Sequence, residues 1–464
     1  MAEEFDITAR HPQYDEYEGA WRLMRHSYEG EDEIKEHGEA YLPMKSGIKA
    51  ISDVARRDAA YDAYRDRAEF PEIVAPTIRG LMGVIHNKGS EYRIPTGMEY
   101  IVEMATKDGQ TLEQVHHKIT NELLRVGRYG LMPGVSESGE FHIAGYDAEC
   151  IINWDEDRYL VLNETHKARN PESNKWEKKR EYRECWIDEA GKYASRLWIG
   201  VTGQDGKTTY IPGEVETATV KGRDGLEIMP FVFAGSIDTT PDPDDIPLYG
   251  LAKLAVRAYQ LDADYRNSMH LTSEPTPWVS GVNKDHAPKS IGAASLWVLD
   301  DPTAKCGMLE FTGSGIGAQK QAIDDTLERA VLFGAQMFSD NRRTAESGDA
   351  LKLRLGAQRA TLVMIAKASA AALEKVLKNI ATWGGMNPDE VMVTPNLEFV
   401  EIDLTPQEIL ALVSGWQSGG YSKRTLYENL QRGGVANPER TFEDEEDLIS
   451  TEGQGLGEIP PAVA

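Results

Sequence analysis

Two long amphipathic stretches, residues 249–270 and 318–338, enclose a short segment with strand-like runs, and this arrangement most constrains the fold. In the first stretch, apolar side chains recur at three- and four-residue steps from Leu251 to Met269, which predicts a helix about 30 Å long. A helix with one apolar stripe and charged flanks must bury that stripe against a partner. The sequence leaves two partners open: the body of the same chain, or other copies of it.

The second stretch has the same pattern, with Ala322, Leu327 and Ala330 in register. Between the stretches we expect a short strand at 278–281 and a strand pair formed by 295–299 and 307–311. Gly313-Ser-Gly-Ile-Gly317 predicts a tight strand-to-helix connection with unusual φ angles. After the second helix, the sequence predicts a polar loop at 339–350, a long Ala- and Leu-rich helix at 351–383 that stops at Gly384-Gly385, and a strand at 390–402.

The rest of the chain divides into a helical beginning, a β-rich middle and a helical end. Asp205-Gly206 is a strong hairpin signal inside the β-rich part, and Pro241–Pro247 reads as a rigid, acidic linker. The fold class is therefore α+β, with a C-terminal tail that we expect to be disordered over 451–464. Helices are predicted at 12–28, 53–68, 72–85, 111–127, 406–417 and 422–432, and strands at 149–154, 159–163, 181–187, 197–201 and 208–212.

The charge excludes one class of function. Lys and Arg number 50 and Asp and Glu 76, for a net charge of −26 over 464 residues. A protein that grips nucleic acid along a broad basic face must neutralise many phosphates, and this chain cannot. Three isolated cysteines, Cys150, Cys185 and Cys306, fit a reducing compartment. The sequence shows neither a signal peptide nor a membrane-spanning stretch, so we expect a protein made in a cytosol, with no membrane partner.

No residue pattern supports catalysis, a cofactor or a metal. Gly206-Lys207-Thr208 ends like a P-loop but sits at a predicted hairpin turn, and Val201 occupies the position of the first glycine. The histidines do not fall at a metal-ligand spacing, and Asp324-Asp325 reads as a solvated helix face. We therefore expect no catalytic, cofactor-binding or metal residues and no enzyme. A nucleotide-binding enzyme that uses Gly313–Gly317 or the histidines stays open as an alternative.

An ordered set of segments carries a family resemblance. The segments are His11-Pro-Gln-Tyr with Trp21 and Tyr28-Glu-Gly30, Tyr41-Leu-Pro43, Val126-Gly-Arg-Tyr-Gly-Leu131, Met229-Pro-Phe-Val-Phe-Ala-Gly235, Ser268–Pro277 and Gly307-Met-Leu-Glu-Phe-Thr-Gly313. With the order helix, strand insert, return helix, polar loop and long helix, they resemble a family of tailed-bacteriophage portal proteins long catalogued as uncharacterised phage proteins. The resemblance covers about residues 10 to 450.

The resemblance implies a portal-type fold with named parts. These are a wing of N-terminal helices and an antiparallel β subdomain (1–247), a first stem helix (248–270), a small α/β clip (271–315), a second stem helix (316–338), a tunnel loop (339–350), a long wing helix and strand (351–402) and a helical crown (403–450).

The resemblance also implies a function without catalysis. Portal subunits form a ring, usually of twelve copies, at one capsid vertex of the virion, after synthesis in the host bacterial cytoplasm. Double-stranded DNA passes through the ring during packaging and ejection without sequence-specific contacts. The implied partners are the terminase large subunit, a head–tail adaptor protein and the major capsid protein. Another phage scaffold or adaptor protein remains an alternative.

Two groups of candidate site residues follow from the resemblance. In the tunnel loop, Asn341, Arg342 and Arg343 face the DNA channel, unless the arginines are ordinary surface residues or pair with Asp340 and Glu346. In the clip, the candidate contacts for adaptor or terminase are Trp278, His286, Lys289 and Trp297, although both tryptophans can instead pack between neighbouring clips. A mainly acidic channel wall repels phosphates and lets a duplex slide.

Overall fold

The computed structural model has an α+β fold. Helices account for 47% and strands for 20%, which confirms the predicted class. By spatial contact the chain divides into two compact units, Met1–Pro395 and Asn396–Ala464. The structure describes residues 5–136, 138–156, 158–203, 206–220, 225–273, 276–283, 290, 297–299, 302–309, 314–338, 348–397, 399, 406–432, 435–437 and 440–452.

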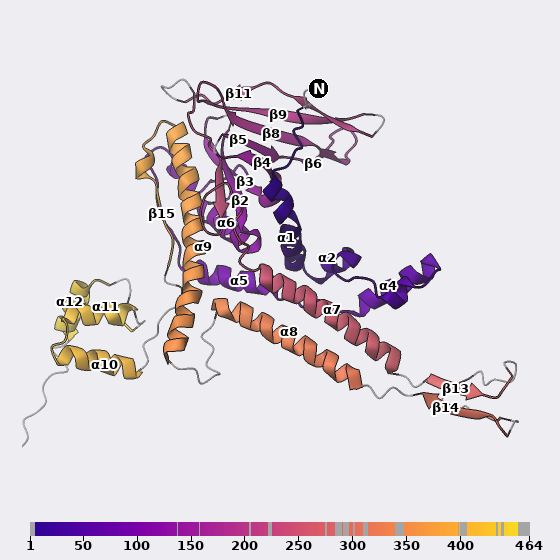
Figure 1. Cartoon of the computed structure of the whole chain (residues 1–464). Helices are drawn as coiled ribbons and strands as arrows, with labels where there is room; N and C mark the ends of the chain where they lie inside the picture. Colours follow the sequence, from indigo (N-terminus) through magenta and orange to yellow (C-terminus); the bar gives the residue numbers. More distant parts are fainter. Residues whose placement is uncertain are drawn as a thin grey trace, which may run out of the picture. The chain divides into compact units, whose positions relative to one another are not determined.

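The first unit begins with helices, shown in indigo and violet in Figure 1. The four helices predicted before residue 130 are confirmed within two residues at each end. Local capping explains the boundaries: Asp53 accepts a hydrogen bond from the Arg56 N–H, and Thr111 and Gln114 form a capping box. The elements are α1 (Pro12–Glu29), α2 (Glu31–Glu36), η1 (Gly38–Ala40), α3 (Ser46–Lys49), α4 (Val54–Arg67), α5 (Val74–Ile85), η2 (Glu99–Val102) and α6 (Leu112–Val126).

Antiparallel sheets follow the helices. The predicted meander is confirmed as a six-stranded sheet of order β10-β9-β8-β5-β4 with β11 on β9. Its strands are β4 (Ile151–Asp155), β5 (Tyr159–Asn163), β8 (Glu181–Ile187), β9 (Tyr193–Thr202), β10 (Thr208–Pro212) and β11 (Glu216–Thr217), and β4 is joined to β3 by η3 (Ala148–Cys150). A second sheet has the order β12-β2-β3, from β2 (Arg128–Val135), β3 (Phe141–Asp147) and β12 (Val232–Gly235).

Three further strand pairs are short. The hairpin of β6 (His166–Arg169) and β7 (Trp176–Lys179) extends from the meander, and β1 (Glu91–Arg93) pairs with β15 (Met392–Thr394). The predicted strand at 390–402 is therefore mostly wrong: β15 has three residues, η5 (Pro388–Glu390) precedes it, and residues 395–397 are not in a strand. The third pair, β13 (Thr276–Ser280) with β14 (Lys305–Leu309), follows α7 and precedes α8.

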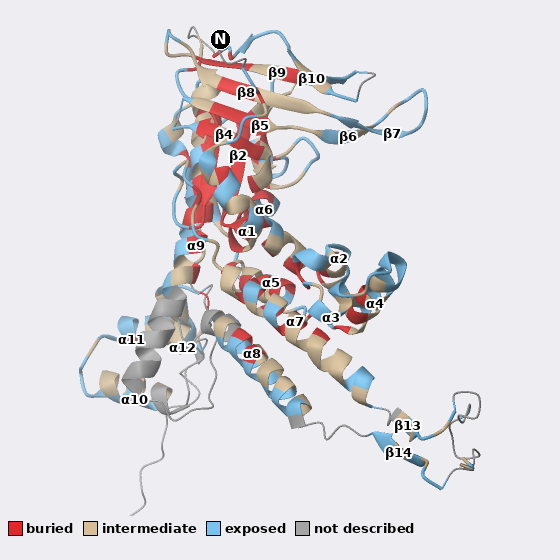
Figure 2. Ribbon diagram, turned by 45° about the vertical axis from the view of Figure 1, so that its right-hand side comes forward, coloured by how far each residue is buried: buried red, intermediate tan, exposed pale blue. Residues whose placement is uncertain are grey.

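The main core lies where α9 (Gly348–Trp383) packs against α6 and the β12-β2-β3 sheet, as the red segments of Figure 2 show. From residue 360 on, α9 is apolar on most sides, and Ile365, Leu373 and Ile380 are fully buried. Because α9 begins at Gly348, the predicted polar loop is shorter at its C-terminal end than expected. The rest of that loop, 339–347, lies outside the described residues.

The helix pair predicted around the strand insert is confirmed as α7 (Tyr249–Thr272) and α8 (Ser314–Phe338). Two details of the prediction are wrong. Gly315 and Gly317 lie within α8 with ordinary φ angles rather than in a strained connection, because α8 starts earlier than expected. Residues 297–299 are not in a strand, and β14 pairs with β13 instead. The two strands continue from the adjacent ends of two antiparallel helices, which brings them together directly.

The acidic segment 241–247 is packed against the body of the first unit. Arg128 is buried, donates from Nη1 to the Pro241 carbonyl at 2.6 Å, and stacks over Trp154, 4.3 Å from the ring centroid. The Ser236 hydroxyl donates to the Asp245 carbonyl at 2.8 Å. Gly127 has φ +69°, and a Cβ there would lie 2.9 Å from the same carbonyl oxygen, so only glycine fits. Burial lowers the pKa of Arg128 to about 9.

The second unit is a small helical cluster, and its first two helices are as predicted: α10 (Pro406–Gln417) and α11 (Lys423–Arg432). A further helix, α12 (Phe442–Glu452), corrects the expectation that 451 begins a disordered tail, since Thr451 and Glu452 are helical. Thr441 and Asp444 cap it reciprocally, its acidic first turn suits a helix N-terminus, and Phe442 packs on Tyr427 with ring centroids 5.8 Å apart. Residues 453–464 lie outside the described part.

Among the described residues, no helix combines the length and the hydrophobicity that crossing a membrane requires.

Candidate functional site: the α7–α8 helical hairpin

Helices α7 and α8 run antiparallel and contact each other at both ends of the pair. Near the start of α7, a Cβ at Gly250 would lie 2.8 Å from the ring of Phe333 on α8, so glycine permits the close approach. At the other end, the Gln319 side-chain amide donates to the Ser268 hydroxyl at 3.2 Å. These two contacts fix which residues of the two helices lie at the same level.

One face of α7 belongs to the core of its own chain. Ala255, Tyr259 and Ala263 are fully buried in a cluster with side chains from α2, α4 and the segments after η1 and α4, among them Tyr61 and Phe70. Burying a large aromatic side chain contributes on the order of 2–3 kcal/mol relative to leaving it exposed. Part of the apolar stripe predicted on α7 is therefore buried within its own chain.

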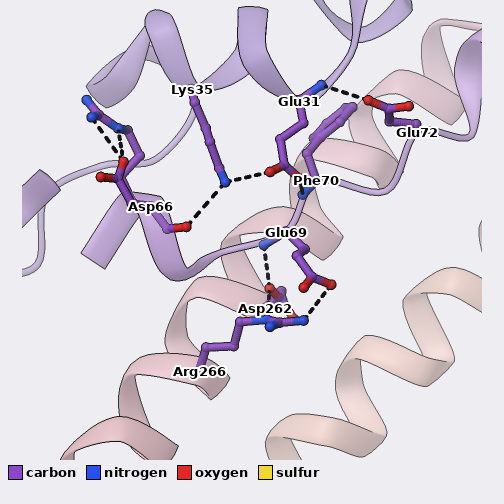
Figure 3. Close-up of polar contacts among 9 residues, drawn as sticks. Glu31, Lys35, Asp66, Glu69, Phe70, Glu72, Asp262 and Arg266 are labelled. Atoms are coloured by element: carbon purple, nitrogen blue, oxygen red, sulfur yellow. Dashed lines mark hydrogen bonds and ion pairs between the residues drawn. The ribbon is translucent and has the colours of Figure 1, made fainter. Parts of the chain in front are cut away.

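Hydrogen bonds and ion pairs also connect α7 to the segment after α4, as Figure 3 shows. On α7, the Asp262 carboxylate accepts from the Glu69 N–H and from Arg266, both at 2.7 Å, and Arg266 also pairs with Glu69 at 2.5 Å. Beside it, Glu31 accepts from Lys35 at 2.6 Å and from the Phe70 N–H at 2.8 Å. The segment after α4 is thus tied both to α7 and to α2.

The Glu31 carboxylate of this network has a shifted pKa. Burial raises it, but the hydrogen bonds from Lys35 and the Phe70 N–H outweigh burial and hold the pKa of Glu31 below its usual value.

The exposed face of α7 borders a basic groove. The groove lies between α1, η1 and α7, has a volume of about 460 Å³, and is lined by Arg22, Lys253 and Arg257 with apolar stems and Tyr41. Lys253 stacks on Tyr249, 4.0 Å from the ring centroid. No carboxylate lines this groove, and none of the three cations is ion-paired with a carboxylate in the part of the chain that the structure describes. In a chain of net charge −26, such a grouping of cations is unusual.

The outer face of α8 is acidic and apolar. Asp324, Asp325 and Glu328 are exposed, and within the described ranges none of them pairs with a basic side chain. Val331 and Leu332 are 61% and 54% exposed, although Thr326 and Ala330 on the side that faces α7 are buried. At 100° per residue, Asp324, Glu328 and Val331 lie roughly opposite the buried side.

The basic and acidic faces lie at similar levels along the hairpin. Counted from the Gly250–Phe333 contact, Arg257 is seven residues along α7, or about 10 Å, and Glu328 is five residues back along α8, or about 8 Å. Lys253 lies at about 5 Å and Asp325 at about 12 Å on the same scale. Arg257 on α7 thus lies between the levels of Glu328 and Asp325 on α8.

The structure describes only part of the predicted site. Trp278 on β13 is 42% exposed and covers Gly307, its cross-strand partner on β14. The Trp297 indole N–H donates to the Ser290 carbonyl at 2.8 Å. The other predicted site residues lie outside the described residues: His286, Lys289, Asn341, Arg342 and Arg343.

Sequence reasoning missed the basic groove, because Arg22 and the two α7 cations are far apart in the chain. The available signal was the four-residue spacing of Lys253 and Arg257 on the face opposite the buried stripe. It also missed a group of three possible metal ligands, His26, Glu33 and His37. The P-loop-like Gly206-Lys207-Thr208 lies at the β9–β10 turn, as predicted.

Comparison with known proteins gives one family match and structural neighbours. Residues 247–384, which span α7 to α9, match the family described as "Domain of unknown function (DUF4055)". No curated protein matches the chain. The chain is similar to a chain in the neck of an empty GTA particle computed with C6 symmetry, with 11% identity, 79% of this chain and 90% of that chain covered, and a TM-score of 0.38.

A chain in the neck of a native GTA particle computed with C12 symmetry is also similar, with 12% identity, 76% and 88% coverage, and a TM-score of 0.37. Both TM-scores are below 0.5, so neither neighbour carries an argument about this chain.

Proposed function

We propose that the chain is a phage portal subunit, which forms a ring, usually of twelve copies, around a channel for double-stranded DNA. The observation that carries the proposal is the pair of unmatched faces on one hairpin. Arg257 and Lys253 on α7 lack carboxylate partners among the described residues, and Glu328 and Asp324 on α8 lack basic ones, with Glu328 close to the level of Arg257. A second copy of the chain supplies both.

Contact between different faces of the same chain leads to a closed ring or an open filament. Here α7 of one subunit meets α8 of the next, so the interface is heterologous, and repeated rotation closes it into a ring. The exposed Val331 and Leu332 add apolar area beside the charges. Surface ion pairs contribute only about 0.2–1 kcal/mol each, so several must act together with that apolar contact.

The remaining roles follow from the resemblance noted in the sequence. The β13–β14 hairpin and the residues around it take the place of the clip, where Trp278, His286, Lys289 and Trp297 meet the terminase large subunit and later a head–tail adaptor. Asn341, Arg342 and Arg343 face the channel. The major capsid protein surrounds the ring in the virion. The subunit itself catalyses no reaction.

The ring interface is tested by charge reversal and rescue. The double variant Lys253→Glu, Arg257→Glu places like charges opposite Asp324 and Glu328 of the neighbour, and like-charge contacts at an interface cost several kcal/mol. We expect the rings seen by negative-stain microscopy and mass photometry to dissociate. Adding Asp324→Lys and Glu328→Lys restores opposite charges and should restore rings.

The matched control is the double variant Lys178→Glu, Lys179→Glu, the same charge change on the exposed β6–β7 hairpin, which should leave rings intact. A purified chain that stays monomeric at all salt and protein concentrations contradicts the ring. Rings that survive the double reversal contradict this interface but leave the ring in place.

The channel role has its own test. Replacing Arg342 and Arg343 by Ala removes mobile cations that make weak, sequence-independent phosphate contacts. We expect reduced packaging of DNA into capsids while the rings remain intact by microscopy. Unchanged packaging would show that these arginines have no role in the channel.

A further inference from the structure

Two imidazoles and one carboxylate meet where α1 turns into α2. One ring nitrogen each of His26 and His37 and one carboxylate oxygen of Glu33 lie within 4.8 Å of one another. The Glu33 Oε1 atom is 3.2 Å from His37 Nε2 and 3.8 Å from His26 Nε2. The three residues are brought together because Gly30, with φ +106°, reverses the chain between the two helices, and because Glu33 and His37 lie four residues apart.

We propose that His26, Glu33 and His37 form a binding site for a divalent transition-metal ion of the zinc type. Two imidazole nitrogens and one carboxylate oxygen are a donor set that Zn²⁺ accepts, with a fourth position left for water. Tetrahedral coordination at the usual zinc–ligand distances places ligand atoms about 3.3 Å apart. The two separations from Glu33 Oε1 already lie close to that value.

The orientation of His26 is set by a neighbour, as in many metal sites. The Tyr41 hydroxyl lies 2.7 Å from His26 Nδ1, which engages that nitrogen and leaves Nε2 for a metal. Tyr41 is itself buried, and its carbonyl accepts from Gln260 of α7 at 2.8 Å. A metal held by His26 would therefore also stabilise the contact between the α1–α2 turn and Gln260 of α7.

One rearrangement accompanies binding. The two imidazole rings are stacked in parallel, with centroids 3.9 Å apart and 2° between their planes, so their lone pairs do not converge. His37 is 40% exposed and His26 only 13%, so the His37 ring tilts toward Glu33 when the metal enters. Burial, followed by His37 and Arg22, lowers the pKa of His26 against the effect of Glu33, and Arg22 also repels a dication.

The test is a zinc titration of the full chain, without an affinity tag and after treatment with chelator. We expect one saturable Zn²⁺ site per chain by isothermal titration calorimetry, and a visible absorption band typical of tetrahedral coordination when Co²⁺ replaces zinc. His37→Ala and Glu33→Gln, both at partly exposed positions, should remove the site. Tyr41→Phe should weaken zinc binding about 10- to 100-fold, because it frees the orientation of His26.

The matched control is His166→Ala, which removes an exposed histidine that lies 3.8 Å from Glu181 and should leave zinc affinity unchanged. Absence of saturable binding overturns the proposal, and so does binding that His37→Ala and Glu33→Gln leave intact. The measurement does not depend on the oligomeric state of the chain, so its failure leaves the proposed ring untouched.

Discussion

Helices α8 and α9 are both long and both carry apolar side chains, yet the structure uses them in different ways. From residue 360 on, α9 contacts α6, β2, β12 and β15, and its side chains are buried on most sides. Helix α8 packs mainly on α7, and Val331 and Leu332 are more than half exposed. Apolar residues on α9 thus stabilise the chain itself, whereas those on α8 are available to a second copy.

The largest expected effect lies on α9. Leu377→Ala should lower the free energy of unfolding by about 2–5 kcal/mol, because Leu377 is fully buried and truncation leaves a cavity. Leu332→Ala is the same substitution on α8 and should change the free energy of unfolding by less than about 0.5 kcal/mol. Urea unfolding of the monomeric chain measures both. Equal effects would abolish the distinction between the two helices.

Acid should weaken the α6–α9 contact specifically. His116 on α6 is buried beside Ser369 of α9, with 3.1 Å between Nε2 and the hydroxyl, and burial followed by the His117 charge lowers its pKa to about 4. Between about pH 6.5 and 4 the unfolded chain binds a proton that the folded chain does not, so stability falls as pH falls. Over this pH range the free energy of unfolding should fall by about 3 kcal/mol.

The measurement is urea unfolding at pH 7, 5.5 and 4.5 for the parent chain and for His116→Gln. The variant cannot titrate, so the difference between the two pH profiles isolates this histidine from the carboxylates. Parallel profiles would mean that His116 is as easily protonated in the folded chain as in the unfolded one.

A smaller effect is expected where α7 meets α8. Gly250→Val should cost about 1–3 kcal/mol, because the new side chain overlaps the Phe333 ring. The control is Gly317→Ala on α8, where nothing lies near the added Cβ, and which should stabilise the helix by about 0.5–1 kcal/mol. Thermal unfolding distinguishes them, and a neutral Gly250→Val would show that the two helices do not approach closely.

The smallest effect on the single chain should accompany a clear effect on assembly. Val331→Ala removes two methyl groups from an exposed position, so the free energy of unfolding of the monomer should change by less than about 0.5 kcal/mol. The fraction of chain in rings, measured by mass photometry at fixed concentration, should fall. A monomer destabilised by more than 1 kcal/mol would place Val331 in the core of its own chain.

Sequence patterns predicted the helices well, because caps and periodic apolar side chains act locally. Thr111 and Gln114 mark the start of α6 and Gly127 its end, all within a few residues. The same patterns failed for β2, whose first six residues are all buried and therefore lack the alternation that identifies a strand. They also failed for α12, whose acidic composition resembles a solvated tail, although Thr441 and Asp444 form a recognisable cap.

The candidate site depends on contacts that no local pattern contains. The periodicity of the sequence predicts that each helix has an apolar stripe. The elements that lie beside the helix decide whether Leu254 or Val331 packs against its own chain or against another copy. Strand pairing in the insert failed for the same reason, because β13 and β14 are brought together by the helices before and after them. His26 and His37 meet only because Gly30 turns the chain between two helices.

The packed segment 241–247 has a mechanical consequence. Arg128 donates to the Pro241 carbonyl, and Ser236 donates to the Asp245 carbonyl. The segment is therefore held at two points before α7 begins at Tyr249. A torque applied to the hairpin is therefore passed into β2 and its sheet instead of being absorbed at the joint. At this junction lies Gly127, which no larger residue can replace.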